Sequence, residues 1–375
     1  MVPSGRLRIL LDYRPALRQR TGVGEYAHNL AGALCRLAPD DEVTLFSSSW
    51  KDRLRPDAVA GASTIDRRIP VSVLNFAWHR LGWPPVERLG AAADVAWSLH
   101  PLVMPSRRAA QVVTVHDLHF LDHPEATTRE VRRDYPALAA AHVRRADGVI
   151  ANSEYTRGLI EARLGIPPDR ITVCYPGAPA WRVREEPSKP GPILHVGTIE
   201  PRKNVQALIR AYLALAREHP ETPPLVLAGR IASPVARLAA EDAQGELFRT
   251  RVRFAGYVSD AERLQLYRDA SMLVIASSDE GFGLPALEAL TIGLPVVASR
   301  RGSLPEVLGE AGMLVNPDDT AALSGAMLRL LSDEDLRRAQ AAKGVSRARH
   351  FNWDDSAGRL RTAFEHARSR KAGRS

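Results

Sequence analysis

The chain has 375 residues, of which 45% are hydrophobic and 25% charged, a balance typical of a globular protein with a full core. Its formal net charge is +8, but the arginines are scattered along the chain, which favours a solvated surface over a nucleic-acid-binding patch. Cys35 and Cys174 are too few for a disulfide framework, and no run of about 18 uncharged apolar residues occurs. We therefore expect a cytoplasmic protein with no membrane-spanning helix and no nucleic-acid partner.

Short β-branched runs alternate with longer helical stretches from one end of the chain to the other. Strands are expected in the first half at residues 8–13, 43–48, 111–117, 147–153 and 171–176. Strands are expected in the second half at residues 192–197, 224–229, 252–257, 272–277, 295–299 and 312–316. Because these runs are apolar on both faces and alternate with helices, they predict parallel sheets covered by helices. The expected fold is α/β, with two doubly wound Rossmann-like domains.

The segment 176–192 divides the two sets of strands. It is rich in proline, glycine and charge and has no apolar period, so it reads as a linker. We place an N-terminal domain at residues 1–178 and a C-terminal domain at residues 190–350. Ligands of open parallel sheets bind beyond the carboxyl ends of the strands, so we expect a site in a cleft where the two domains face each other.

The stretch Gly22-Val-Gly24-Glu-Tyr-Ala27 matches the glycine fingerprint of dinucleotide-binding proteins, but its context does not fit. The glycines should follow the first strand directly, whereas residues 14–21 intervene, and the second strand does not end in an acid. We interpret the stretch as a glycine loop that opens a helix and lets the backbone approach a ligand. A plain structural turn is the alternative.

A second loop follows the strand at 192–197 and runs into an amphipathic helix. It contains Arg202 and Lys203, which places two adjacent cations between a strand and a helix. An arginine fork beside a lysine point charge suits a diphosphate. The alternative is a solvated surface pair.

A third loop presents an apparent conflict of charge. Gly281-Phe282-Gly283-Leu284, followed by Pro285, predicts a loop that opens a helix, and a helix N-terminus attracts anions. Yet Glu280 and Glu288 flank this point, and carboxylates repel phosphate. They can instead accept hydrogen bonds from sugar hydroxyls. We therefore predict that amides of this loop face phosphate while the two acids hold two sugars, as in a nucleotide sugar. An N-cap acid and a first-turn charge are the alternative.

The acidic run Asp333-Glu334-Asp335 is a weaker candidate site. A D-x-D pattern can bind a metal, but this one follows Ser332 and precedes a helical stretch, so we interpret it as the first turn of a capped helix. We expect no metal and no cofactor.

The third loop also carries a family resemblance. Glu280 and Glu288, with seven residues between them and G-F-G-L-P inside, resemble the E-x7-E motif of the retaining family 4 glycosyltransferases of GT-B fold. Residues 252–290 and 293–319 resemble that family almost word for word. The chain also resembles the other conserved stretches of that family, in the same order, at residues 21–30, 112–125, 149–160, 171–178 and 197–204. Residues 197–204 and 303–312 are most similar to its mannosyltransferase-like branch.

The resemblance implies a role for each matching residue. Glu280 would contact the donor hexose and Glu288 the ribose, while Arg202 and Lys203 would neutralise the diphosphate. Further donor contacts are implied for Gly281, Phe282 and Gly283 near phosphate and sugar, for Tyr257 and Val258 at the base, and for Gly22 and Gly24 over the diphosphate.

Two positions need separate comment. His116 would lie near the transferred sugar, although a strand-end histidine that bonds only backbone is the alternative. Many family members carry arginine where this chain has Thr198, so diphosphate binding here would rest more heavily on Arg202 and Lys203.

The resemblance further implies an activity and an architecture. The activity is transfer of a hexose, with GDP-mannose as the favoured co-substrate, to a glycan or lipid-linked acceptor with retention of configuration. A helix at about 353–369 would cross back onto the first domain. A sugar-nucleotide epimerase and a non-catalytic binding protein are the alternatives. The E-x7-E motif argues against the first, and the intact set of Glu280, Glu288, Arg202 and Lys203 argues against the second.

Residues 74–89 bear on the acceptor. Their apolar and basic side chains could rest on the inner face of a membrane that carries a lipid-linked acceptor. The residues concerned are Phe76, Trp78, Leu81 and Trp83, with Arg80 and Arg88. A core-packed helix that ends at Gly82 is the alternative that we prefer.

Overall fold

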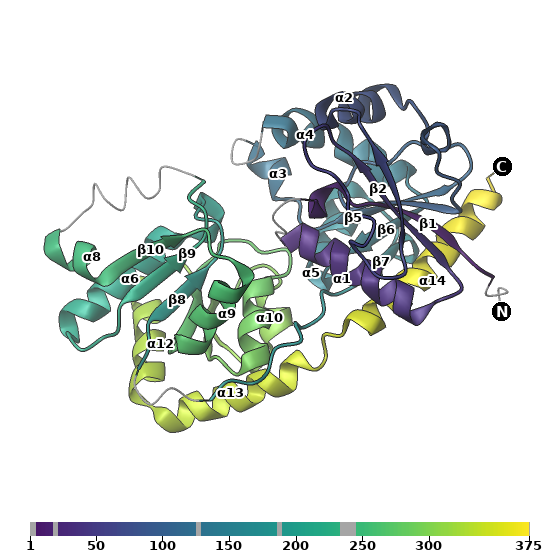
Figure 1. Ribbon diagram of the computed structural model, residues 1–375. Coiled ribbons are helices and arrows are strands. Elements are labelled where there is room, and N and C mark those ends of the chain that lie inside the picture. The colour runs from purple at the N-terminus through teal and green to yellow at the C-terminus, as the bar shows by residue number, and fades with distance from the viewer. Residues whose placement is uncertain (1–4, 18–21, 125–128, 186–189, 233–244, 375) are drawn as a thin grey trace. The chain divides into compact units, whose positions relative to one another are not determined.

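The structure, a computed structural model, describes residues 5–17, 22–124, 129–185, 190–232 and 245–374 (Figure 1). The chain divides into two compact units, Met1–Gly177 with Asn352–Ser375, and Ala178–Phe351. The change of unit after Gly177 falls next to the expected boundary at 178. The segment expected as a linker is assigned to the second unit from Ala178 onward.

The first unit is built on a parallel sheet of seven strands in the order β3-β2-β1-β4-β5-β6-β7. Its strands are β1 (Arg8–Asp12), β2 (Glu42–Ser48), β3 (Ser63–Arg67), β4 (Val95–Ser98), β5 (Ala110–Val115), β6 (Gly148–Ala151) and β7 (Ile171–Val173). Its helices are α1 (Gly22–Leu37), α2 (Val71–Phe76), α3 (His119–Asp122), α4 (Arg129–Arg145), α5 (Glu154–Leu159) and α14 (Trp353–Ala372). Short helical turns are η1 (Arg14–Ala16), η2 (Ala77–Leu81), η3 (Val86–Leu89), η5 (Ile160–Leu164) and η6 (Pro168–Arg170).

The C-terminal helix α14 belongs to this first unit. It packs against α1 and β5, and Figure 1 shows it lying beside α1. Leu360 and Phe364 are buried in the same apolar cluster as Trp97 of β4, and the rings of Phe364 and Trp97 lie 5.5 Å apart. The last helix of the chain therefore completes the core of the first unit.

The second unit is built on a parallel sheet of six strands in the order β10-β9-β8-β11-β12-β13. Its strands are β8 (Ile193–Val196), β9 (Leu225–Ala228), β10 (Val252–Gly256), β11 (Met272–Ile275), β12 (Val296–Ser299) and β13 (Met313–Val315). Its helical segments are η7 (Pro201–Lys203), α6 (Val205–Glu218), α8 (Gly245–Arg251), α9 (Asp260–Asp269), α10 (Leu284–Ile292), α11 (Leu304–Leu308), α12 (Thr320–Ser332) and α13 (Glu334–Ala348). Helix α12 packs on α6, and α13 packs along α10 (Figure 1).

The strand order of the second sheet reverses at β8. Strands β9 and β10 follow on one side of it, whereas β11 lies on its other side, with Leu194 in register with Leu273. In an open parallel sheet the loops at such a switch point diverge and leave room for a ligand. The loops that follow β8 and β11 therefore form the natural place for a site in this unit.

The segment at 74–89 divides into a buried part and an exposed part. Helix α2 continues into η2, which ends at Gly82 as expected, and the side chain of Trp78 is fully buried beside Phe46, with ring centroids 5.4 Å apart. By contrast, Leu81 and Trp83 are more than half exposed. The preferred core-packed interpretation therefore holds for Trp78 and fails for Phe76 and Leu81, which are both more than half exposed, while Trp83 lies beyond the end of the helix.

The acidic run at residues 333–335 can also be compared with the structure. The acidic run opens α13, where the side chain of Asp333, and not of Ser332, caps the helix by accepting from the Leu336 amide at 2.8 Å. Among the described residues, no group of three or more histidine, cysteine or acidic side chains is placed to hold a metal ion. None of the helices in the described part of the chain has the length and apolar character to cross a bilayer.

Candidate functional site

Two loops at the switch point are joined by hydrogen bonds. The amide and the hydroxyl of Ser278, after β11, donate to the carbonyl of Arg202 at 2.8 and 3.0 Å. In return, the Arg202 guanidinium donates to the carbonyl of Asp279 at 3.0 Å. Residues 77 positions apart in the chain are thereby held in one rigid pair of loops.

Glu280 lies buried between the two predicted cations. Its Oε1 is 2.5 Å from Lys203 Nζ and accepts from the Ser277 hydroxyl at 2.7 Å, while its Oε2 is 3.3 Å from Arg202 Nη1. Burial alone would raise the pKa of this carboxyl, but Lys203 and Arg202 together lower it to about 2. Glu280 is therefore ionised across the physiological range, and the amide and hydroxyl of Ser303 fix its backbone carbonyl, each at 3.0 Å.

A second acid at this cluster was missed from the sequence. Glu200 Oε1 accepts from Arg202 Nη2 at 3.0 Å, so Arg202 bridges two carboxylates. Glu200 stands two residues before Arg202 in the loop that follows β8, and this spacing is the signal in the sequence that could have revealed it. The adjacent cations Arg202 and Lys203 instead favoured an interpretation in terms of phosphate alone. Glu200 and Glu280 together balance the charges of Arg202 and Lys203.

Helix α10 begins where the glycine and proline pattern predicts. Gly283 is its N-cap, with φ 90° and ψ 55°, and Pro285 lies in the first turn. The left-handed backbone at this position favours glycine, and a Cβ added here would lie 2.8 Å from Leu304 Cδ2. Phe282 is buried edge-on against Phe351, with ring centroids 5.6 Å apart, so its ring serves packing. The α10 terminus thus offers backbone amides, from Gly283 and Leu284 onward, to an anion.

Glu288 lies one turn further along α10 and has different neighbours from Glu280. Tyr267 Oη donates to Glu288 Oε2 at 2.8 Å, and Arg263 Nη2 lies 3.3 Å from Glu288 Oε1. Both partners come from α9, and the Glu288 side chain stays 13% exposed. Glu280 and Glu288 thus lie in two separate charge environments.

The remaining predicted donor contacts of this unit follow its strands. Thr198 comes two residues after β8 and is half-buried. Tyr257 comes directly after β10 with its side chain 57% exposed, and Val258 beside it is half-buried. All three lie at the carboxyl edge of the second sheet, where the β8 and β11 loops also lie.

Three of the predicted site residues, His116, Gly22 and Gly24, belong to the first unit. His116 follows β5, and its Nε2 donates to the carbonyl of Leu99 at 3.2 Å, which is the bond that the structural alternative requires. Burial lowers the pKa of His116 to about 4, so the ring is neutral near pH 7. Its role at the transferred sugar stays a prediction.

The two glycines at the start of α1 differ. Gly22 is exposed in the first turn, whereas Gly24 is buried, and a Cβ there would lie 2.8 Å from the carbonyl oxygen of Pro15. The absence of a side chain at Gly24 is thus used for close packing against η1. Their proposed contact with diphosphate remains a prediction, and residues 18–21 before them lie outside the described part of the chain.

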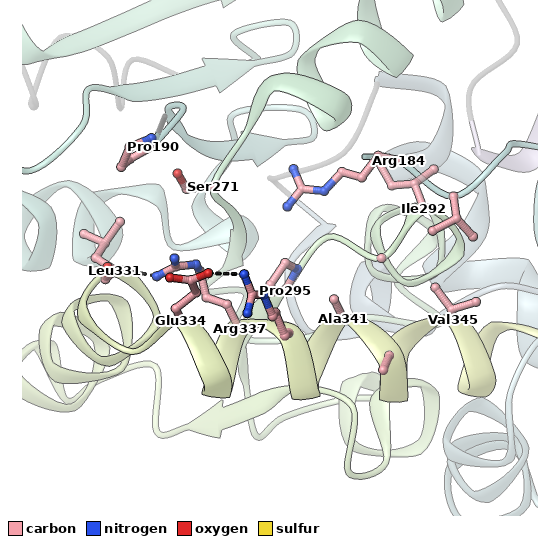
Figure 2. A pocket seen from close by; sticks show the side chains of 14 residues that line it. Arg184, Pro190, Ser271, Ile292, Pro295, Leu331, Glu334, Arg337, Ala341 and Val345 are labelled. Atoms are coloured by element: carbon pink, nitrogen blue, oxygen red, sulfur yellow. Dashed lines mark hydrogen bonds and ion pairs between the residues drawn. The ribbon is translucent and has the colours of Figure 1, made fainter. Parts of the chain in front are cut away.

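A separate cavity of about 570 Å³ lies in the second unit (Figure 2). It is lined by Arg184, Ile292, Val345 and further residues of α13, and it shares no residue with the predicted site. Arg184 donates to the carbonyls of Tyr267 and Arg268 at 3.4 and 3.2 Å, which caps the end of α9. We interpret this cavity as a gap between packed segments of the second unit and not as the reaction site.

Two Rossmann-like units, with a C-terminal helix that returns to the first, define the two-domain α/β GT-B fold. The comparison with known families agrees. Residues 20–182 match the family described as Glycosyltransferase Family 4, and residues 180–347 match Glycosyl transferases group 1. The chain belongs to the family 4 glycosyltransferases and is an enzyme of the hexosyltransferase class.

Individual relatives include mannosyltransferases. The chain is 29% identical to O-antigen chain mannosyltransferase B of Escherichia coli, over 93% of this chain and 97% of that protein. It is 36% identical to the serotype-specific mannosyltransferase WbdA of Escherichia coli over 44% of this chain, a match that spans 20% of WbdA. Among solved structures, it resembles a sucrose-phosphate synthase from Thermosynechococcus elongatus with a TM-score of 0.75 and 21% identity, covering 96% of this chain and 98% of the other.

Proposed function

We propose that this enzyme transfers mannose from GDP-mannose to a glycan or lipid-linked saccharide with retention of anomeric configuration. The observation that carries the proposal is the cluster of Glu280, Arg202 and Lys203 beside the α10 N-terminus, with Glu288 on the same helix. Cations and helix-end amides suit a diphosphate, and the two carboxylates suit sugar hydroxyls. The preference for mannose is supported by the names of the relatives.

The reaction breaks the bond between the anomeric carbon and the phosphate oxygen. Negative charge then grows on the diphosphate while the sugar becomes oxocarbenium-like. Arg202, Lys203 and the α10 amides stabilise the leaving group electrostatically. The acceptor hydroxyl attacks the same face of the sugar, its oxygen forms the new glycosidic bond, and its proton passes to the departing phosphate.

The ion pairs at Glu280 suggest how donor binding is coupled to sugar recognition. Diphosphate oxygens compete with Glu280 and Glu200 for the same guanidinium and ammonium donors. As the diphosphate takes up these donors, the Glu280 carboxylate regains capacity to accept hydrogen bonds from the hexose. The diphosphate therefore prepares the acid that holds the sugar.

A panel of nucleotide sugars tests this function. The protein is incubated with GDP-mannose, GDP-fucose, UDP-glucose and ADP-glucose, with and without a mannose oligosaccharide, and nucleoside diphosphate release is measured. We expect release from GDP-mannose that depends on the acceptor, and an α-linked product by NMR. Release without acceptor would indicate hydrolysis, an interconverted sugar would indicate an epimerase, and binding without turnover would indicate a non-catalytic protein.

A lipid-linked acceptor would bring the enzyme to the cytoplasmic face of a membrane. The exposed Leu81 and Trp83 support this placement, because the Arg88 guanidinium lies 5.9 Å from the Trp83 ring and adds positive charge beside an apolar side chain. We expect the protein to float with liposomes that contain anionic lipid, and Leu81→Ser/Trp83→Ser to reduce flotation at least several-fold. Trp50→Ser is the matched control, since Trp50 is another exposed tryptophan of the same unit. Equal flotation of all three proteins would rule out membrane contact through this segment.

A further inference from the structure

Two side chains of helix α9 contact the carboxylate of Glu288. Tyr267 and Arg263 are four residues apart on that helix and therefore lie on the same face. The Tyr267 hydroxyl contacts Oε2 of Glu288 at 2.8 Å, while the Arg263 guanidinium contacts Oε1 at 3.3 Å. Because each partner takes a different oxygen, the two contacts together fix the rotation of the carboxylate plane.

Trp181, near the start of the second unit, contacts both Tyr267 and Arg263. The ring of Trp181 lies 5.8 Å from the ring of Tyr267, and the Arg263 guanidinium lies 5.9 Å from the centroid of the Trp181 ring. Ring contacts of this kind restrict the rotamers of both partners. Packing against Trp181 thus preorganises the two side chains that contact Glu288.

The chemistry of the contacts leaves Glu288 able to act. Tyr267 is fully buried, and burial together with the Glu288 carboxylate raises its pKa well above the usual value, so the phenol is protonated and donates. Each carboxylate oxygen can accept about two hydrogen bonds, so these contacts orient the group without exhausting its capacity for hydroxyl donors. A carboxylate already held in one orientation can meet two vicinal hydroxyls with little further loss of its own side-chain entropy.

We propose that Tyr267 and Arg263 are positioning residues that aim Glu288 at the ribose and thereby make the enzyme select ribonucleotide donors over deoxynucleotide ones. This inference rests on the proposed function, in which Glu288 holds the ribose hydroxyls. The selection is a property of the α9 to α10 contact and not of Glu288 alone.

The test compares a nucleoside diphosphate with its dideoxy counterpart. Dissociation constants are measured by calorimetry for GDP, UDP and ADP, and then for the 2′,3′-dideoxy form of whichever binds wild type most tightly. We expect the dideoxy form to bind wild type about 100-fold more weakly, and Tyr267→Phe to reduce that ratio to about tenfold, since a hydrogen bond to an ionised group contributes about a tenfold factor. Arg263→Gln is expected to reduce the ratio in the same direction.

Two controls separate positioning from general loss of structure. Tyr212→Phe removes another buried tyrosine hydroxyl of the same unit, one that donates to the Pro223 carbonyl at 3.0 Å, and it should leave the ratio unchanged. In a Glu288→Ala background, Tyr267→Phe should have no further effect on the ratio, because the group that it aims is gone.

Every outcome of this test either supports the inference or overturns it. A ratio that is unchanged in Tyr267→Phe, or equal weakening of both ligands, would overturn it, because a structural role alone weakens both. A wild-type ratio near one would also overturn it, while the proposed function could still stand. Failure of wild type to bind any of the three diphosphates would instead remove the proposed function and this inference with it.

Discussion

In the proposed function, Glu280 serves both charge balance and recognition of the sugar. Its carboxylate lies within 2.5 Å of Lys203 Nζ and 3.3 Å of Arg202 Nη1, so it competes with any anion for these cations. Removing it leaves both cations in place with one fewer carboxylate to share. The loss should therefore fall on the sugar and not on the diphosphate.

We expect Glu280→Ala to lower kcat by 10²-fold or more while the dissociation constant for GDP stays the same or decreases. kcat should fall because an interaction with the transferred hexose is lost, which costs several kcal/mol of transition-state stabilisation. The dissociation constant for GDP should not rise, because a competitor for Arg202 and Lys203 is removed. Steady-state kinetics and calorimetry measure the two quantities. Glu310→Ala, at an acid that is 93% exposed, is the control. Near-normal turnover in Glu280→Ala would disprove the donor role.

The components of this site were visible in the sequence, but their pairing was not. Glu280, Arg202 and Lys203 were identified from residue type and local context. That Glu280 bonds both cations depends on β8 and β11 being neighbours in the sheet, which brings together loops 77 residues apart. Strand order is a tertiary property, so a local pattern could not supply the contact or the part played by Glu200.

At the scale of whole elements, most strands were predictable because their apolar runs lie between clear turn signals. Strands β3 and β4 were missed for two different reasons. β3 (Ser63–Arg67) is an edge strand with no fully buried residue, and its sequence is polar. β4 (Val95–Ser98) is fully buried but has four residues and follows an alanine-rich stretch that lacks strand character. Packing against β1 and β5 decides its conformation.

The start of α10 gives a prediction at the same scale. Gly283→Ala should lower the free energy of unfolding of the second unit by about 1–2 kcal/mol, because alanine is strained at φ 90° and its Cβ would meet Leu304. Donor affinity should fall with it, since the helix-end amides would shift. Gly325→Ala is the matched control in α12, where an added Cβ meets nothing within 4 Å. That variant should gain about 0.5–1 kcal/mol in chemical unfolding. Equal effects of the two substitutions would contradict the role given to Gly283.

At the scale of the whole molecule, buried neutral histidines occur in both units. Burial lowers the pKa of His79 to about 3 and those of His142 and His195 to about 4. The nearby ring of His100 contributes further to the low pKa of His79, and the two ring centroids lie 5.6 Å apart. An unfolded chain protonates each of these side chains near pH 6.5, well above the folded values.

These shifts predict a loss of stability in mild acid. Between about pH 4 and 6.5 the unfolded chain binds more protons than the folded chain, so the free energy of unfolding rises with pH in this window and falls as pH is lowered through it. On going from pH 7 to pH 5, each buried histidine should contribute a loss on the order of 1–2 kcal/mol. Chemical unfolding followed by tryptophan fluorescence at the two pH values measures the sum.

His79→Phe should reduce that pH dependence by one histidine's share, about 1–2 kcal/mol. Neither ring nitrogen of His79 has a hydrogen-bond partner, so an apolar ring of similar shape loses no bond and should raise stability at pH 5. Leu74→Ala removes a buried side chain from the apolar cluster that contains Trp78, the residue before His79, and is the control. It should lower stability by about 2–4 kcal/mol at both pH values and leave their difference unchanged. If His79→Phe also left the difference unchanged, protonation of this histidine would not be what destabilises the enzyme in acid.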